Sequence, residues 1–145
     1  MDIVMKFLVS LAIALSFLSN AALASSPEGN WVSEDGGTKV RISMCGGNKL
    51  CAKLIWLDQP IDPATGKPKT DKLNPDPAKR ERPLIGLEVV HALAPSGPHT
   101  WSGQIYNADD GRTYKANLKV ESDIAKVKGC VLAVLCKSHT WTRAN

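Results

Sequence analysis

Apolar and polar positions alternate along the chain after residue 25. Residues 38–44 place Val40, Ile42 and Met44 on one face of an extended segment, and residues 114–120 alternate in the same way. Six further segments are rich in apolar, β-branched or aromatic residues and end at turn residues: 30–34, 50–57, 85–93, 100–107, 124–129 and 137–143. The pattern predicts an all-β protein of eight strands.

Glycine-rich turns separate several of these segments, at residues 35–37, 46–48 and 109–111. Turns this tight join antiparallel neighbours and cannot serve as crossovers. Eight short antiparallel strands with one polar face can close into an up-and-down β-barrel, which leaves no free edge. A sandwich of two sheets has the same alternation and remains the alternative fold.

Residues 58–83 break the β pattern, with prolines at positions 60, 63, 68, 75, 77 and 83. Because proline cannot donate to a sheet ladder, this segment is predicted to be one long loop with a single helical turn after Asn74. Loops of this length in a compact domain are either functional or disordered. A solvated flap and a lid over a cavity both fit the sequence.

The N-terminus has the pattern of a secretory signal peptide. Lys6 is followed by an uncharged apolar run over residues 7–18, and Ala22-Leu23-Ala24 has the small-x-small form of a cleavage site. A retained anchor needs roughly 20 apolar residues, and this run is shorter. We expect residues 1–24 to be cleaved. Residues 25–145 would then form a single β-barrel domain in the periplasm, without a membrane span.

All four cysteines follow residue 24, in two copies of the spacing C-x5-C. An exported chain meets an oxidising compartment, and each spacing fits a hairpin closed by its own bridge, so we pair Cys45 with Cys51 and Cys130 with Cys136. By strand parity both bridges lie outside the barrel. A four-cysteine zinc site is the alternative, but the usual C-x2-C spacing is missing.

The formal net charge is +4, and the basic residues are spread without a clustered stripe. This distribution does not favour a nucleic-acid partner, and we expect a monomer. The sequence lacks a Gly-x-Ser-x-Gly elbow, a Gly-Lys-Ser/Thr phosphate loop and a His-Glu-x-x-His motif. We therefore predict no catalytic residue, no metal and no cofactor, and an enzyme is the least favoured class.

Two of the three histidines are predicted to point into the barrel. His91 shares its parity with Val89 and Leu93, and His139 shares its parity with Trp141. Two inward histidines would suit a metal or an acidic ligand, whereas the commoner case is a buried histidine with satisfied hydrogen bonds. His99 lies in a Pro/Gly-rich turn and is predicted to be exposed.

An ordered series of motifs covers nearly the whole of the predicted mature chain: Gly29-Asn30-Trp31, Leu50-Cys51, Asp71 with Asn74-Pro75, Arg82-Pro83-Leu84-Ile85-Gly86, Trp101-x-Gly103-x-Ile105-Tyr106-Asn107, Asp110-Gly111-x-Thr113-Tyr114, Gly129-Cys130 and Trp141-Thr142-Arg143. The series resembles the exported bacterial family known as domain of unknown function 2147. Ala108 and Ala52 depart from it, at positions where that family tends to have proline and glycine. The resemblance implies a lipocalin-like periplasmic barrel and no established activity.

The Gly-x-Trp opening and an arginine on the last strand also resemble the broader lipocalin and calycin pattern. In that pattern a first-strand tryptophan packs beneath a guanidinium and plugs one end of the barrel. Trp31 and Arg143 are the matching residues. A planar cation over an indole face gains roughly 0.5 to 2 kcal/mol. The alternative is that Trp31 is an ordinary core residue and Arg143 a frayed end.

The sequence is compatible with two functions. The first is the binding of a small, largely apolar ligand in the barrel mouth beneath the long loop. The second is a protein-interaction module, such as an envelope enzyme inhibitor or assembly partner, with a solid barrel in which large residues such as Trp56 fill the lumen. The candidate ligand-binding residues are Asp71, Asn74, Arg82, His91, Trp101 and His139.

Overall fold

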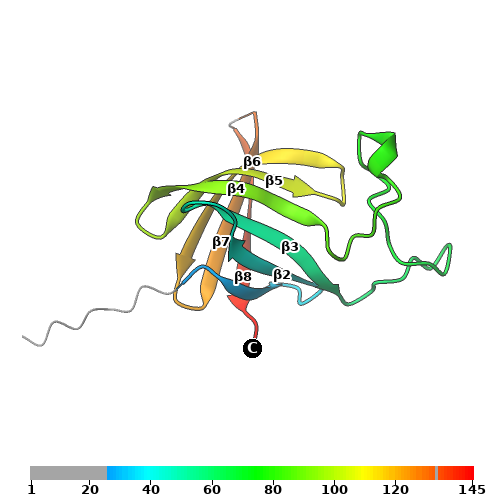
Figure 1. Ribbon diagram of the computed structural model, residues 1–145, viewed down its shortest axis with the longest axis horizontal. Coiled ribbons are helices and arrows are strands. Elements are labelled where there is room, and N and C mark those ends of the chain that lie inside the picture. The colour runs from blue at the N-terminus through cyan, green and yellow to red at the C-terminus, as the bar shows by residue number, and fades with distance from the viewer. Residues whose placement is uncertain (1–25, 133) are drawn as a thin grey trace, which may run out of the picture.

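The computed structural model describes residues 26–132 and 134–145, so the predicted signal peptide lies outside the described residues. The chain forms one closed barrel in which each strand is antiparallel to the next and the last returns to the first (Figure 1). The strands are β1 (Gly29–Ser33), β2 (Thr38–Met44), β3 (Leu50–Leu57), β4 (Glu88–Gly97), β5 (Thr100–Asn107), β6 (Arg112–Glu121), β7 (Ile124–Val131) and β8 (Leu135–Arg143). The predicted eight-stranded up-and-down barrel is confirmed.

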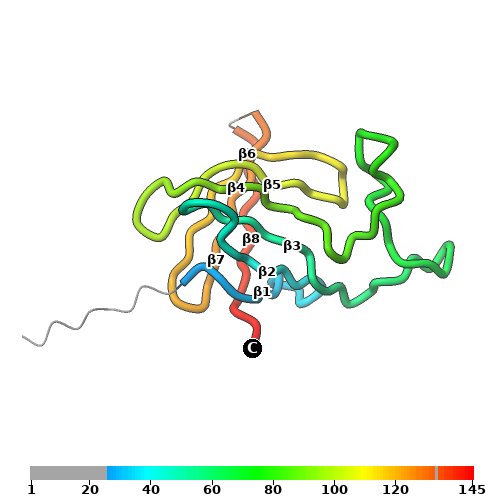
Figure 2. The backbone as a smooth tube through the Cα atoms, viewed as in Figure 1, coloured from blue at the N-terminus to red at the C-terminus, as the bar shows by residue number. Residues whose placement is uncertain are grey.

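Because successive strands run in opposite directions, their connections alternate between two ends of the barrel. The closed end carries the β2–β3, β4–β5 and β6–β7 turns and the segment that enters β1. The open end carries the β1–β2 turn, the long β3–β4 loop and the β5–β6 and β7–β8 turns (Figure 2).

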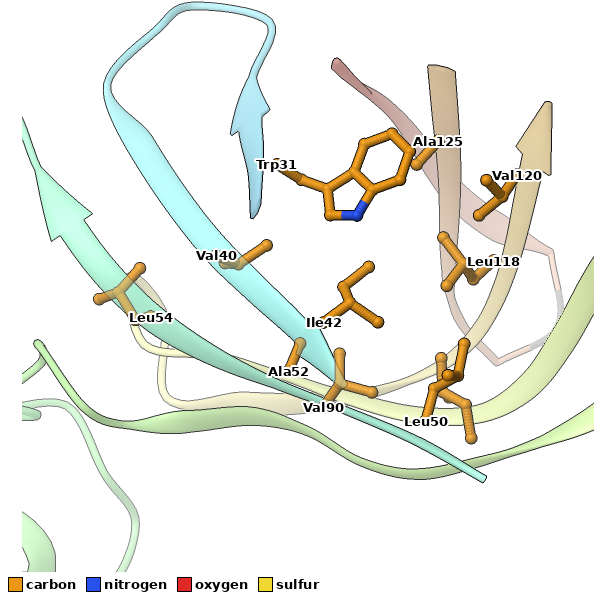
Figure 3. Packing of buried hydrophobic residues seen from close by; sticks show 11 residues of the cluster. Trp31, Val40, Ile42, Leu50, Ala52, Leu54, Val90, Leu118, Val120 and Ala125 are labelled. Atoms are coloured by element: carbon orange, nitrogen blue, oxygen red, sulfur yellow. The ribbon is translucent and has the colours of Figure 1, made fainter. Parts of the chain in front are cut away.

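The core fills the closed half of the barrel. Strand alternation turns the apolar positions of neighbouring strands toward one another, as Trp31 meets Val40 and Val40 meets Leu54 across the ladders. The cluster is made of eleven buried side chains from six strands, ten of which are labelled in Figure 3: Trp31, Val40, Ile42, Leu50, Ala52, Leu54, Val90, Leu93, Leu118, Val120 and Ala125. Side chains therefore fill this half of the lumen.

Strand β4 differs from its prediction in both extent and parity. It was expected at residues 85–93, whereas residues just before β4 bond to β3 as an irregular segment, with the Gly86 amide on the Leu54 carbonyl at 2.7 Å. The ladder is also irregular near Ala92, which has a φ of 53°. A bulge of this kind turns residues on either side to the same face. Val90 and Leu93 are therefore both buried.

The predicted inward orientation of His91 is wrong for the same reason. Its side chain is 84% exposed, since the bulge after it reverses the alternation on which the prediction rested. Opposite the bulge stands Gly103, where an added Cβ would lie 2.8 Å from Leu93 Cδ2. The other strands differ from their predicted bounds by at most two residues at either end.

Both predicted disulfides are present. Cys45 is joined to Cys51 across the β2–β3 turn, and Cys130 is joined to Cys136 across the β7–β8 turn. Cys51 is buried even though it shares the outer face with Ser43, because β4 lies against it at the bulge, with the Ala92 amide 3.4 Å from Cys51 Sγ. Among the described residues, no helix is long and apolar enough to cross a membrane.

The β3–β4 loop contains the predicted helical turn, a single 3-10 turn η1 (Pro77–Lys79). Two isolated antiparallel bridges organise the rest, between Ile61 and Pro68 and between Thr70 and Pro83. The second bridge forms a neck at which the outgoing and returning chains meet. The loop is thus folded and extends from the open end, on the right of Figure 1.

Candidate functional site

The floor of the barrel is Trp31, which is fully buried. Arg143 lies directly opposite it in the β1–β8 ladder and places its guanidinium carbon 4.4 Å from the indole centroid. The indole Nε1 donates to the Pro27 carbonyl at 3.0 Å. The tryptophan is thus held on its face by a cation and at its edge by a hydrogen bond, and it seals the closed end.

Arg143 also ties together two segments that are distant in sequence. Its Nη1 and Nη2 donate to the carbonyls of Glu28 and Ser26 at 3.0 and 2.8 Å, and its Nε donates to the Asp123 carboxylate at 3.0 Å. Gly29 has a φ of 131°, and a Cβ at this position would lie 2.9 Å from Arg143 Nη1. The glycine of the Gly-x-Trp motif is therefore required for this contact.

Toward the open end the lumen is not fully covered. Leu57, Ile105, Val127 and Trp141 pack against the core cluster but are only half-buried. These side chains lie on the lumen-facing side of their strands, since they pack against the core cluster and each pairs with a residue of the same parity as the core. This half of the barrel has the apolar lining that small-ligand sites commonly show.

A notch opens the barrel wall beside this lining. Strand β1 pairs with β8 from Ser33↔Trp141 to Trp31↔Arg143, so the first part of β8 has no β1 partner among the described residues. A depression of about 320 Å³ lies there, lined by Ser33, Glu34, Asp35, His139, Thr140 and Trp141. Its volume is in the range of small-ligand sites.

An ionised carboxylate borders the notch. Asp35 accepts hydrogen bonds from the Ser33 hydroxyl at 2.6 Å and the Gly37 amide at 3.0 Å. These two bonds, the hydroxyl first, lower the pKa of the Asp35 carboxyl, and His139 adds a smaller lowering. The rim of the apolar lumen is therefore polar and negatively charged on the β1–β2 side.

Three of the predicted ligand-binding residues meet at the neck of the long loop. Asp71 is fully buried, and its Oδ2 accepts from Asn74 Nδ2 at 2.7 Å and from Arg82 Nε and Nη2 at 2.9 and 2.8 Å. Its Oδ1 accepts from the Tyr106 hydroxyl at 2.5 Å. We call Asp71, Asn74, Arg82 and Tyr106 the neck cluster.

The neck cluster fixes the loop to the outside of the barrel. Tyr106 follows Ile105 in β5, and Ile105 faces the lumen, so Tyr106 projects from the outer face. Leu73 packs on the β5–β6 turn so closely that a Cβ on Gly111 would lie 1.9 Å from the Leu73 carbonyl oxygen. The predicted residues are thus brought together, but on the opposite side of the wall from the lumen.

Hydrogen bonds within the protein engage the polar atoms of the neck cluster. Asn74 Oδ1 accepts from the Asp76 amide at 2.9 Å, and Arg80 Nε donates to the Asn74 carbonyl at 2.8 Å. Burial and the bond to Asp71 raise the pKa of the Tyr106 phenol. Across the described residues no buried side-chain polar atom lacks a partner. The cluster is therefore a self-contained framework for the loop.

The other three predicted residues are dispersed. His91 lies on the outer face beside Glu88, with its Nδ1 2.5 Å from the carboxylate. His139 stands opposite Val127 in the ladder, on the lumen side as parity predicted, but it is exposed at the notch and not buried. Trp101 is half-buried against the core. Trp56 is on the outer face, where Lys39 lies over its ring at 5.0 Å.

One set of side chains has the proximity of metal ligands but not their chemistry. Cys51, Glu88 and His91 bring their ligand atoms within 4.8 Å of one another. The Cys51 sulfur is bonded to Cys45 and offers no thiolate, which leaves an exposed histidine and a half-exposed carboxylate. Two such groups are too few for a closed metal site.

Tyr106 and the notch were not predicted as site elements. A signal for Tyr106 was present, because a large aromatic residue at an outward position of a strand needs a covering partner. The notch had no signal in the sequence, since it depends on how far β1 reaches along β8 after the barrel closes. Closure is a property of all eight strands together.

Comparison with known proteins gives a family and a fold. The family model described as "Uncharacterized protein conserved in bacteria (DUF2147)" matches residues 29–143. A solved structure, the protein HP1028 of Helicobacter pylori, described as belonging to the lipocalin family, superposes with a TM-score of 0.69 at 24% sequence identity. The superposition covers 83% of this chain and 84% of the HP1028 chain. No curated protein matches the sequence.

Proposed function

Because the chain belongs to the bacterial family DUF2147 and folds as a lipocalin-like barrel, we propose that it binds one small, largely apolar ligand in the open half of its lumen. The observation that supports this most is the half-buried apolar lining of Leu57, Ile105, Val127 and Trp141 above a sealed floor. A ligand seated there would remove this apolar surface from water, which is the main source of affinity for such molecules.

The notch beside Trp141 is the proposed entrance. It borders the apolar lining and offers His139 and the ionised Asp35 to any polar group at one end of the ligand. An apolar body with a single polar or cationic end would satisfy both surfaces. We therefore assign Trp141 and His139 to the site, and Trp101 to the packing below it.

A direct ligand contact by Asp71, Asn74 and Arg82 has less support than a structural role. The buried polar groups of Asp71 and Asn74 are engaged within the neck cluster, as are Arg82 Nε and Nη2, and a buried group that is already satisfied gains little by exchanging partners. We propose instead that the neck cluster holds the long loop against the wall beside the open end.

We also propose that the protein acts outside the cytoplasm. Two disulfides join all four cysteines, and such bridges persist in oxidising compartments such as the bacterial periplasm. The signal-like N-terminus of the sequence supports the same location. The ligand would then be a molecule of the cell envelope.

The test is binding of the neutral apolar dye N-phenyl-1-naphthylamine, followed by its fluorescence. Val127 faces the lumen and is half-buried, so Val127→Phe should fill the space and weaken dye binding by about ten-fold or more. The matched control is Lys126→Phe, the preceding residue on the outer face of β7, which should leave dye binding unchanged.

Each outcome of this experiment has one meaning. Saturable dye binding that Val127→Phe weakens and Lys126→Phe does not would support the lumen site. Failure of the unmodified protein to bind the dye would contradict a ligand-sized apolar lumen. Equal losses in the two variants, measured with melting temperatures that match the unmodified protein, would place the dye elsewhere.

A further inference from the structure

The tip of the β7–β8 hairpin carries bare apolar side chains. Leu132, Val134 and Leu135 are 82, 80 and 68% exposed, whereas the other exposed large hydrophobic residues of the described chain reach at most 51%. Single apolar residues on a surface are ordinary, but a group in one turn marks an interaction site. We call these three residues the apolar tip.

The apolar tip protrudes beyond its neighbours. The ladder between β6 and β7 ends at Lys115↔Cys130, and β1 reaches β8 only as far as Trp141. Past these points no strand of residues 26–132 and 134–145 flanks the hairpin, and it stands clear of the barrel at the top of Figures 1 and 2. The Cys130–Cys136 bridge closes its base. The tip is therefore a narrow, stapled projection.

Turn chemistry does not account for the residues at this tip. Leu132 has a φ of 53°, a conformation that glycine and asparagine adopt with less strain and that tight hairpins normally assign to them. A polar turn would also avoid the exposed apolar surface. Both the backbone strain and the exposed apolar surface make leucine unfavourable here in the isolated chain. We therefore expect that a partner in contact with the tip compensates for this cost.

Lysines surround the base of the hairpin. Lys115 lies opposite Cys130, Lys137 lies opposite Gly129, and Lys128 lies two residues before Cys130. All three are exposed, and within the described ranges none of them forms an ion pair. Lys115 and Lys128 project from the outer face, and Lys137 shares the lumen-side parity of Gly129. We call these three residues the basic collar.

We propose that the hairpin docks the protein onto an anionic lipid bilayer, with the apolar tip in the interface and the basic collar against the headgroup phosphates. Apolar side chains backed by lysines are the combination that binds such surfaces. Each lysine near an anionic surface strengthens binding by about five-fold at moderate salt. Docking would turn the open end toward the membrane, and it does not depend on whether the lumen holds a ligand.

Charge decides between a bilayer and a second copy of this chain. Two copies meeting tip to tip would bring two basic collars together, and like charges in contact oppose association. A bilayer containing anionic lipid offers the opposite charge over a whole plane. The apolar tip and the collar are therefore both satisfied by one membrane surface.

The test is co-sedimentation of the protein, expressed from its full coding sequence, with phosphatidylcholine vesicles containing about 30% phosphatidylglycerol. The variant is Leu132→Ser/Val134→Ser/Leu135→Ser, and its bound fraction should correspond to at least about ten-fold weaker partitioning. The matched control is Met44→Ser/Ile124→Ser, which removes two apolar residues of the closed end that are 45 and 44% exposed. This control should bind like the unmodified protein.

The outcomes separate the two occupants. Binding that requires phosphatidylglycerol, falls with rising salt and is lost in the tip variant alone supports the proposal. Failure of the unmodified protein to sediment with these vesicles overturns it. So does a dimer, seen by analytical ultracentrifugation, that the tip variant dissociates while vesicle binding is unaffected. Melting temperatures of all variants show that each is folded.

Discussion

Arg82 clamps the neck of the long loop onto Asp71 by both side chain and backbone. Its guanidinium Nη2 lies 2.8 Å from Asp71 Oδ2, and its carbonyl accepts the Asp71 amide at 3.0 Å. The Asp71 side chain is completely buried, whereas that of Arg82 is 39% exposed. The pair is thus an anchor for the loop.

Removal of the Asp71 carboxylate should destabilise the protein. In Asp71→Ala the Tyr106 hydroxyl and Arg82 lose their acceptor, and the loss of a buried carboxylate with several hydrogen bonds costs about 3 kcal/mol. The melting temperature should fall by roughly 10 °C. The control is Glu121→Gln, which removes an exposed partner of Lys119 and should leave the melting temperature almost unchanged. Equal melting temperatures for the two variants would contradict the anchoring role.

Stability should fall in alkaline solution because of Tyr106. Its pKa is raised above the ordinary value of 10.0, so folding favours the protonated phenol. That contribution is complete below pH 10.0 and is lost as the pH rises through the higher pKa of the folded protein. Tyr106→Phe should therefore flatten the decline in stability above this pH, measured by denaturant unfolding.

The chain has only two tyrosines, which gives this prediction a direct spectroscopic check. In Tyr114→Phe the remaining phenol is Tyr106, and its ultraviolet titration should have a midpoint above 10.0. In Tyr106→Phe the titration reports Tyr114, whose pKa is raised mainly by its hydrogen bond to Asp110. A midpoint at or below 10.0 in the Tyr114→Phe protein would contradict the buried hydrogen bond to Asp71.

The plug at the closed end should depend on the guanidinium of Arg143. Arg143→Ala removes the cation over Trp31 and the donors to Ser26 and Glu28, at an expected cost of about 2 kcal/mol. Arg143→Lys should recover only part of this, because an ammonium lacks the planar fork. Arg41→Ala, which loses one exposed bond to Asn30, serves as the control and should change the unfolding free energy little.

Gly111 should be far less replaceable than Gly66. The two have similar φ values, +69° and +68°, so alanine at either position costs about 1 kcal/mol in backbone strain. Only Gly111 has a neighbour, the Leu73 carbonyl, into which the new Cβ would run. Gly111→Ala should therefore cost about 2 kcal/mol more than Gly66→Ala in urea unfolding. Equal costs would mean that Leu73 does not pack on the β5–β6 turn.

The fold was predictable because its determinants are local. Alternation such as that of Val40, Ile42 and Met44 identifies a strand with one buried face, and glycine turns identify antiparallel neighbours. Each disulfide closes a single hairpin, so Cys45 with Cys51 could be paired from spacing. Family motifs such as Gly29-Asn30-Trp31 then selected a lipocalin-like barrel over a sandwich.

The orientation of individual side chains was predictable only where the strand is regular. His139 lies on the lumen side of an unbroken β8, as parity requires. His91 lies on the outer face because a bulge at Ala92 reverses the alternation of side chains along β4. A bulge is decided by the fit between two paired strands, here by Leu93 packing where Gly103 leaves space. The sequence of residues 85–93 therefore does not indicate the bulge.

The sequence by itself therefore determined the strands, their antiparallel order, the two bridges and the polar residues of the long loop. Tertiary structure alone decided that Asp71 and Arg82 meet Tyr106 on the outside of the wall, that His139 stands at a notch, and that the apolar tip protrudes. The physical reason is the sequence separation over which the interactions act. Alternation and turns act between residues near in sequence, whereas these sites form between segments that only barrel closure brings together.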